Sequence, residues 1–179
     1  MSTRKNSGVP LAAFFGSAGP ALSDGERAFF RDCNAAGYIL FRRNIETPEQ
    51  VKELVADFRA CVGREDAPVL IDQEGGRVAR LTEPHWRKAP PAAVFGQIAE
   101  TDPALGARGA FLNALLIGAE LRELGINVDC APVLDLRIPG AHDIIGDRAY
   151  SEDPEMIGDL GRAVCDGFVE AGVVPVIKH

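Results

Sequence analysis

Short apolar segments alternate along the chain with longer segments in which apolar residues recur at helical spacing. The short segments contain few polar positions, which is typical of strands buried on both faces of a parallel sheet. Five strands are predicted in this way, over residues 9–15, 38–41, 68–72, 127–131 and 173–178. Strand–helix–strand units of this kind form a parallel sheet with right-handed crossovers. The pattern therefore predicts an α/β fold.

The segments between the strands carry helix-boundary signals. Ser23 followed by Glu26 is a capping box, and Thr47 followed by Pro48 is a second start signal. Glycine follows several of the apolar-periodic stretches, as it does at many helix ends. The predicted helices cover residues 24–36, 48–62, 103–124 and 154–171. Two long connections remain, over residues 73–91 and 132–153.

Two architectures fit this order of elements: an open doubly wound sheet and a (β/α)8 barrel. A whole barrel needs about 250 residues, and the chain has 179. The sequence stops at Lys178-His179, where the fifth strand ends and before any helix covers it. We therefore expect residues 1–179 to be the amino-terminal part of a single (β/α)8 catalytic domain, with about five of its eight units.

The alternative is a complete five-stranded doubly wound domain that serves as a binding or regulatory module. The nucleotide-binding patterns G-x-G-x-x-G and G-x-x-x-x-G-K-[ST] follow none of the predicted strands. Only the segment Gly16-Ser17-Ala18-Gly19 gives a faint indication of a phosphate loop. Nucleotide binding measured by calorimetry would distinguish the two hypotheses.

Composition and charge narrow the function classes. Apolar residues make up 46% of the chain and charged residues 25%, as in an ordinary soluble globular protein. The net charge of −7 argues against binding to nucleic acid. Uninterrupted apolar runs stay well short of the roughly 18 residues of a membrane span, so no membrane partner is expected. Arg4 and Lys5 precede the first apolar stretch as in a secretory signal, but the shortness of that stretch and Pro10 within it favour a strand.

The cysteines indicate a reducing compartment. Cys33, Cys61, Cys130 and Cys165 are widely spaced and form neither a C-x-x-C pair nor a Cys/His cluster. Scattered thiols of this kind are typical of partly apolar core positions in cytoplasmic proteins. We expect no metal, no cofactor and a cytoplasmic location.

Candidate chemistry gathers where the predicted strands end, which is where parallel α/β folds carry their functional residues. Asp72 and Glu74 follow the third strand two residues apart, so their side chains share a face of an extended backbone. Arg77 and Arg80 supply forked donors nearby, and the loop after the fourth strand carries Asp147-Arg148. Acceptors and donors mixed in this way suit a ligand dense in hydroxyl groups.

Structural interpretations of the same residues remain open at this point. The segment around Asp72 could be a loop salt-bridge network, and Asp147-Arg148 could be a surface pair that contributes only about 0–1 kcal/mol. Glu74 fits a supporting role, and Asp135 fits an anchor for the backbone N–H groups of its own loop. For Trp86, packing is favoured over stacking on a ligand.

Four segments of the chain resemble the family 3 glycoside hydrolases. They occur in the order and spacing of that family, most closely as in its single-domain bacterial β-N-acetylhexosaminidases, and they are IDQEGGRVAR at 71–80, APVLD at 131–135, IGDRAYS at 145–151 and KH at 178–179. The resemblance implies a (β/α)8 barrel, monomeric in the bacterial cytoplasm. It also implies removal of terminal non-reducing β-N-acetylglucosamine from peptidoglycan fragments (muropeptides) during cell-wall recycling.

The resemblance assigns sugar contacts to five positions of this chain: Asp72, Arg80, Arg148, Lys178 and His179. In that family the reaction retains configuration through a covalent glycosyl-enzyme intermediate. The nucleophilic Asp and the acid/base His of the family match positions beyond residue 179, so no catalytic residue is assigned and the 179 residues are expected to be inactive alone. A relative that acts on glucosides or other sugars remains a further alternative, because loops that choose the sugar also lie partly beyond residue 179.

Overall fold

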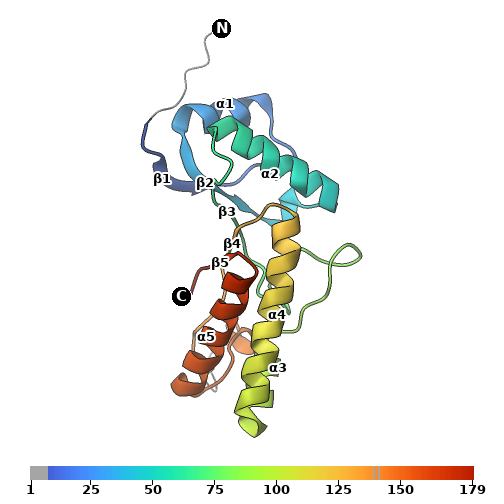
Figure 1. Ribbon diagram of the computed structural model, residues 1–179, viewed down its shortest axis with the longest axis vertical. Coiled ribbons are helices and arrows are strands. Elements are labelled where there is room, and N and C mark those ends of the chain that lie inside the picture. The colour runs from blue at the N-terminus through green and yellow to red at the C-terminus, as the bar shows by residue number, and fades with distance from the viewer. Residues whose placement is uncertain (1–7, 139, 141) are drawn as a thin grey trace.

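The computed structural model describes residues 8–138, 140 and 142–179, so Arg4 and Lys5 of the signal-like start lie outside the described residues. The described strands form one parallel sheet in the order β1-β2-β3-β4-β5 (Figure 1). Their bounds are Leu11–Phe15, Ala35–Leu40, Val69–Ile71, Val128–Asp129 and Val174–Pro175. A doubly wound sheet needs a point at which the strand order reverses. The uninterrupted sequential order instead matches a barrel that is not closed, as predicted.

The helices stand largely where the start signals predict them. They are α1 (Asp24–Cys33), α2 (Pro48–Val62), α3 (Ala92–Thr101), α4 (Pro103–Glu123) and α5 (Pro154–Glu170), with short 3-10 helices η1 (Arg42–Asn44) and η2 (Gly146–Arg148). The Ser23 hydroxyl accepts a hydrogen bond from the Glu26 N–H, and the Glu26 carboxylate accepts one from the Ser23 N–H. The capping box is therefore confirmed.

The end of α1 differs from the prediction. The helix stops at Cys33, and Asn34 takes a left-handed conformation with φ 48° as its cap. Strand β2 begins at once with Ala35, so Gly37 lies inside the strand and does not end the helix. A Cβ atom at Gly37 would lie 2.5 Å from the Pro68 carbonyl oxygen. Gly37 is thus required by close packing of neighbouring strands.

Helix α3 was not predicted from the sequence. Its cap residue, Pro91, makes no side-chain hydrogen bond to the first turn, so the usual start signal is missing. The helix packs against α4, α5 and η2. It therefore helps to place the loop that follows β4.

The prediction that the strand over residues 9–15 is buried on both faces is wrong, and β5 at the other end of the sheet is exposed as well. Leu11 and Phe14 of β1 are 48% and 50% exposed, and Val174 of β5 is 60% exposed. Each of these strands pairs with only one neighbour in the sheet. Strand β3, which has a neighbour on each side, is fully buried.

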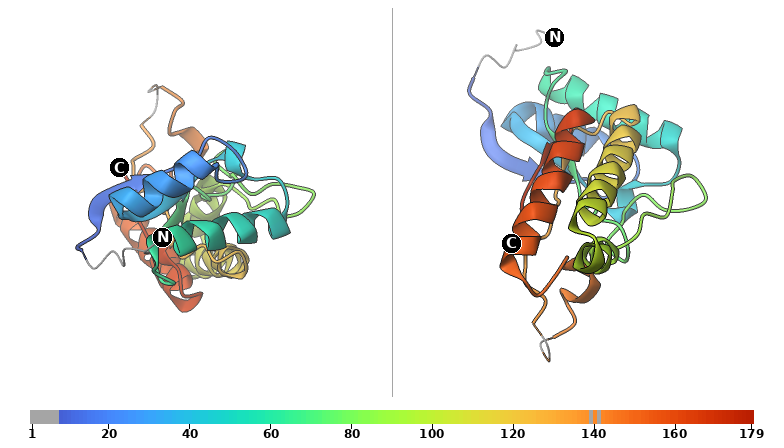
Figure 2. Two further views of the ribbon diagram at one scale, coloured as in Figure 1. Left: turned by 90° about the horizontal axis from the view of Figure 1, so that it is seen from above. Right: turned by 60° about the horizontal axis from the view of Figure 1, so that its bottom comes forward.

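The helices fall into two groups. Helices α1 and α2 pack together, and α4 and α5 run side by side with α3 against them (Figure 2). Helix α4 is long and apolar enough to cross a membrane by length and composition, with a mean hydropathy of 1.3 in its most apolar stretch. Core helices meet the same criterion, and about a third of that stretch is buried in this structure, with Ala110, Ile117 and Leu121 among the buried residues of α4. Trp86 packs partly buried against the core, as expected.

Candidate functional site

The carboxylate of Asp72 lies directly beyond β3 and meets two cations. The Lys178 Nζ atom lies 2.8 Å from its Oδ1, and an Arg80 Nη2 lies 3.2 Å from its Oδ2. Arg80 returns to Asp72 because the loop between them folds back on itself, with the Glu74 N–H donating to the Val78 carbonyl. Two residues eight positions apart are thereby paired.

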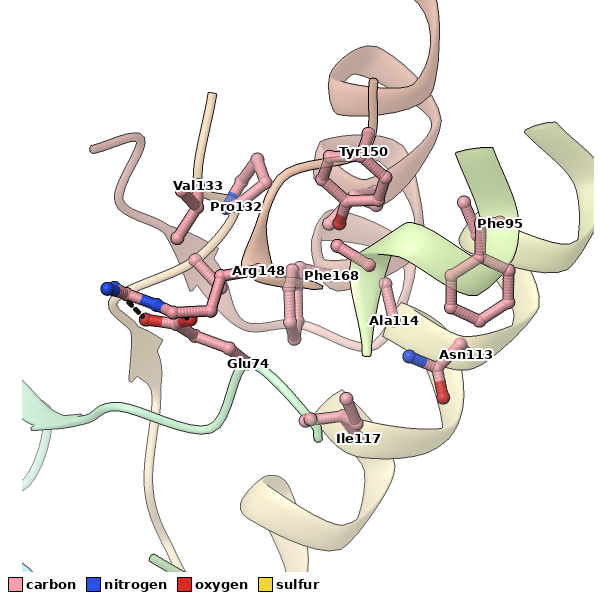
Figure 3. A pocket seen from close by; sticks show the side chains of 15 residues that line it. Glu74, Phe95, Asn113, Ala114, Ile117, Pro132, Val133, Arg148, Tyr150 and Phe168 are labelled. Atoms are coloured by element: carbon pink, nitrogen blue, oxygen red, sulfur yellow. Dashed lines mark hydrogen bonds and ion pairs between the residues drawn. The ribbon is translucent and has the colours of Figure 1, made fainter. Parts of the chain in front are cut away.

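Glu74 links Lys178 to the loop after β4. Its Oε1 lies 2.6 Å from the Lys178 Nζ. The Arg148 guanidinium donates to both carboxylate oxygens, through Nε and Nη2, each at 2.9 Å (Figure 3). The supporting role expected for Glu74 agrees with this geometry. One continuous series of ion pairs with alternating charges results, which we call the salt-bridge row: Arg80, Asp72, Lys178, Glu74 and Arg148.

Backbone pairing explains how Lys178 reaches β3, although β4 lies between β3 and β5. Beyond the last paired residues of β5, the Lys178 N–H donates to the Pro132 carbonyl at 3.1 Å. The Leu134 N–H donates to the Lys178 carbonyl at 2.7 Å. These two bonds hold the backbone at Lys178 beside the start of the loop after β4, at the carboxyl edge of the sheet.

His179 lies at the rim of the site and outside the salt-bridge row. Its Nδ1 atom is 2.7 Å from the Asp135 Oδ2, and its side chain is 50% exposed. The structure therefore brings together four of the five predicted residues through direct ion pairs, with Glu74 as the link to Arg148. For Asp135 the expected role is wrong: its carboxylate contacts His179, and no hydrogen bond to its own loop is found among the described residues.

Arg77 fastens the loop after β4 to the loop after β3. Its Nη2 donates to the carbonyl oxygens of Ile144 and Ile145 at 3.1 and 2.9 Å, and its Nε lies 3.0 Å from an Asp147 carboxylate oxygen. Asp147 and Arg148 are therefore not a surface pair with each other. Each is paired with a residue of the loop after β3, and this arrangement orients Arg148 toward Glu74.

Two buried residues beside the site were not predicted from the sequence. Gln73 is 1% exposed and Asp129 is fully buried, and the Gln73 N–H donates to the Asp129 carboxylate at 2.9 Å. A signal was present, because Asp129 interrupts a predicted apolar strand and a buried acid needs a partner. The partner, 56 positions away, could not be read from the local pattern.

Burial and charge act in opposite directions on the titratable groups of the row. Burial of the Asp72 carboxyl opposes its ionisation, but the hydrogen bond and charge of Lys178, together with Arg80, outweigh it and lower the pKa. Burial likewise opposes the charge of Lys178, whose pKa is nevertheless raised by Asp72 and Glu74. The paired hydrogen bonds to Glu74 raise the pKa of Arg148. All three groups are therefore charged at neutral pH.

The row combines charged donors and acceptors that stay partly open to solvent. The side chains of Arg80 and Asp72 are 28% and 20% exposed, whereas that of Glu74 is 8% exposed. Hydroxyl groups both donate and accept, so a carboxylate and an adjacent guanidinium or ammonium can hold them in pairs. Hydrogen bonds to charged groups contribute about 1.5–3 kcal/mol each. The arrangement can bind a neutral ring with several hydroxyls.

A cavity behind the row is too small to be that ligand's site. It is lined by Glu74, Arg148 and Tyr150 together with apolar residues of α3, α4 and α5 (Figure 3). The space within it is about 20 Å³, which is room for about one water molecule. Pockets for small-molecule ligands are usually 300 Å³ or more.

The segment that indicated a phosphate loop is engaged in packing. The Ser17 hydroxyl is buried, shares a hydrogen bond with the Tyr38 hydroxyl and accepts another from the Asn44 Nδ2 at 2.9 Å. Among the described residues, no group of three or more His, Cys, Asp or Glu side chains could hold a metal ion.

Comparison with known proteins gives the same family as the motifs. The model of the glycosyl hydrolase family 3 N terminal domain matches residues 12–179. A beta-hexosaminidase of Methylococcus capsulatus is 39% identical over 165 residues, which is 92% of this chain and 47% of that protein. One of Xanthomonas campestris pv. campestris is 38% identical over 164 residues. The chain spans about half the length of the curated relatives it matches.

Solved structures agree with this assignment. Native NagZ from Neisseria gonorrhoeae superposes with a TM-score of 0.87 and 31% identity, over 96% of this chain and 50% of that one. The same protein in complex with N-trifluoroacetyl-D-glucosamine gives the same TM-score. The chain belongs to glycosyl hydrolase family 3, and its residues 12–179 match the model of that family's N-terminal domain.

Proposed function

We propose that this chain supplies the sugar-binding half of a β-N-acetylhexosaminidase. The whole protein would remove terminal non-reducing β-N-acetylglucosamine from muropeptides, with retention of configuration. Asp72, Arg80, Arg148, Lys178 and His179 would hold the ring in the subsite for the non-reducing residue.

The observation that carries this proposal is the salt-bridge row at the carboxyl edge of the sheet. Its ionised carboxylates can accept from sugar hydroxyls while its guanidinium and ammonium groups donate to them. The relatives named beta-hexosaminidase support the reaction class. The neighbour bound to N-trifluoroacetyl-D-glucosamine supports an N-acylated glucosamine as the ligand.

The bond-breaking groups are proposed to lie outside these 179 residues. Retaining glycosidases use a nucleophilic carboxylate and an acid/base group on either side of the scissile bond. Asp72 and Glu74 do not suit these tasks, because both carboxylates are occupied by cations in the row. The row would therefore bind and orient the sugar without cleaving it.

We further propose a monomer that works in the cytoplasm on cell-wall fragments, without nucleic acid or membrane as partner. The four cysteines of the chain are free and half-buried, which suits a reducing compartment. Cell fractionation with an antibody against residues of this chain would test the location.

Calorimetry and an activity assay together test the main proposal. N-acetylglucosamine should bind the chain, and glucose should bind more weakly. A chromogenic N-acetyl-β-D-glucosaminide should show no turnover by the 179 residues alone. Absence of any sugar binding would refute the proposed subsite, and clear turnover would refute the assignment of the catalytic groups to other parts of the protein.

A further inference from the structure

Asp129 is a fully buried acid at the carboxyl end of a strand. It lies in β4, and its Oδ1 accepts a hydrogen bond from the Gln73 N–H at 2.9 Å. Its Oδ2 is buried and has no hydrogen-bond partner among the described residues. No sugar contact is assigned to this residue, because it is covered on all sides.

Gln73 extends this contact to the next loop. Its Oε1 accepts from the N–H groups of Arg80 and Leu81 at 2.8 and 3.0 Å, and its Nε2 donates to the Leu81 carbonyl at 3.0 Å. The side chain thus replaces backbone pairing across the base of the loop over residues 73–81. Four hydrogen bonds, one of its backbone and three of its side chain, fix Gln73 in the interior.

The position of Gln73 in the chain couples this interior contact to the salt-bridge row. Gln73 stands between Asp72 and Glu74, and side chains alternate on an extended backbone. Fixing Gln73 on the buried face therefore aims its two acidic neighbours at the opposite face. The bond to the Arg80 N–H also sets where the Arg80 side chain begins.

We propose that Asp129 and Gln73 are positioning residues that hold Asp72 and Arg80 in the sugar-binding arrangement, and that Asp129 does so in its protonated form. The part of this inference that concerns the sugar rests on the proposed function. The part that concerns the loop and the proton does not.

The surroundings of Asp129 favour the neutral acid. The ionisable groups around it are Asp72, Glu74, Cys130, Tyr150 and Lys178. Burial raises the pKa of Asp129 well above its usual range, and the negative charges of Asp72 and Glu74 add to this. The Gln73 N–H and Lys178 act in the opposite direction but do not outweigh burial.

Protonation also agrees with the geometry of the neighbouring row. Lys178 already contacts both Asp72 and Glu74, so it is not free to neutralise a third carboxylate. An unpaired buried charge is far more costly than an unpaired buried hydroxyl. A neutral Asp129 keeps its Oδ1 as an acceptor for Gln73 and leaves Lys178 to the row.

Two variants of the full chain separate the acceptor from the charge. Asp129→Asn keeps an oxygen acceptor and removes the ionisable group, whereas Asp129→Leu keeps the branched shape of the side chain and removes the acceptor. We expect Asp129→Asn to leave the amide hydrogen exchange of Gln73, Arg80 and Leu81 within about twofold of the wild type. Asp129→Leu should speed the exchange of Gln73 and weaken N-acetylglucosamine binding, each by about tenfold, as expected for a buried N–H left without its acceptor. The carboxyl carbon signal of Asp129 should remain that of the neutral acid at pH 6.

Two results would overturn the inference. One is an ionised Asp129 at pH 6, and the other is an Asp129→Asn variant whose loop exchanges as fast as that of Asp129→Leu. Should Asp129→Leu fail to fold, Gln73→Met leaves β4 intact and removes the bonds to Arg80 and Leu81, whose amides should then exchange faster. A wild-type chain that binds no sugar would refute the proposed function, and the exchange rates and the carboxyl signal would still decide the role of Asp129.

Discussion

The guanidinium of Arg148 holds the carboxylate of Glu74 through two hydrogen bonds of 2.9 Å each, across 74 positions of sequence. The same carboxylate meets the ammonium of Lys178. Side chains from two loops and from the residues just beyond β5 are therefore joined at one carboxylate that is 8% exposed. Two parallel hydrogen bonds between a guanidinium and a carboxylate fix the relative orientation of the two groups. Removing one partner of a buried ion pair destabilises the fold, because the other charge is left buried without a counter-charge.

Replacing Glu74 by Gln should destabilise the fold, because Arg148 and Lys178 would lose their shared counter-charge. We expect the free energy of unfolding to fall by about 3 kcal/mol, the lower end for a buried pair broken on one side. Urea denaturation would measure it. Asp24→Asn is the control, because it removes an acid from a fully exposed pair with Arg27 and should change little. Equal losses in the two variants would contradict the central place of Glu74.

Replacing Lys178 by Met should weaken sugar binding. The variant removes a charged donor and leaves Asp72 and Glu74 facing each other. A hydrogen bond to a charged group contributes about 1.5–3 kcal/mol, so the dissociation constant for N-acetylglucosamine should rise about 10- to 100-fold. Calorimetry would show the change. Lys52→Met on the exposed face of α2 is the matched control, and an unchanged affinity in Lys178→Met would remove Lys178 from the subsite.

The lowered pKa of Asp72 predicts a loss of stability in acid. The ionised carboxylate stabilises the folded chain at every pH above its ordinary pKa of about 3.9, and this contribution is lost as the pH falls through the lower pKa of the folded state. The difference in free energy of unfolding between wild type and Asp72→Asn should be constant above about pH 5 and shrink below about pH 4. Urea denaturation between pH 3 and 7 would record it. A difference that grew on acidification would mean that the folded state raises the pKa of Asp72.

Gly96 of α3 supports the loop that carries Arg148. A Cβ atom there would lie 1.6 Å from the carbonyl oxygen of Tyr150, two residues after Arg148. Gly96→Ala should cost about 1–3 kcal/mol of stability, as overpacking does, and should weaken sugar binding by displacing Arg148. Gly158→Ala is the matched control, because Gly158 also lies in a helix and nothing stands within 4 Å of its added Cβ. Gly158→Ala should raise the free energy of unfolding by about 0.5–1 kcal/mol. Equal stability of the two variants would contradict the packing described here.

Local signals and long-range contacts explain which features could be predicted from the sequence. The starts of α1 and α2 were predictable because their capping side chains lie within three residues of the turns they cap. The end of α1 was not predictable. Glycine is the usual residue in the left-handed conformation at a helix end, so Gly37 was expected there, but Asn34 adopts that conformation instead. Helix α3 was missed because Pro91 offers no capping side chain.

The site shows the same division. The motif pattern gave the charged residues at the strand ends, because the carboxyl edge of a parallel sheet follows from strand order alone. It could not show that Asp147 pairs with Arg77 and Arg148 with Glu74, because these contacts depend on how the two loops fold against each other. The exposure of β1 and β5 likewise depends on which strands flank them in the sheet.

Chemical-shift mapping of the isotope-labelled chain during titration with N-acetylglucosamine tests the central claim most directly. The account predicts saturable changes concentrated at Asp72, Arg80, Arg148 and Lys178, with glucose producing weaker changes at the same positions. Changes centred on another part of the molecule, or none at high sugar concentration, would contradict it.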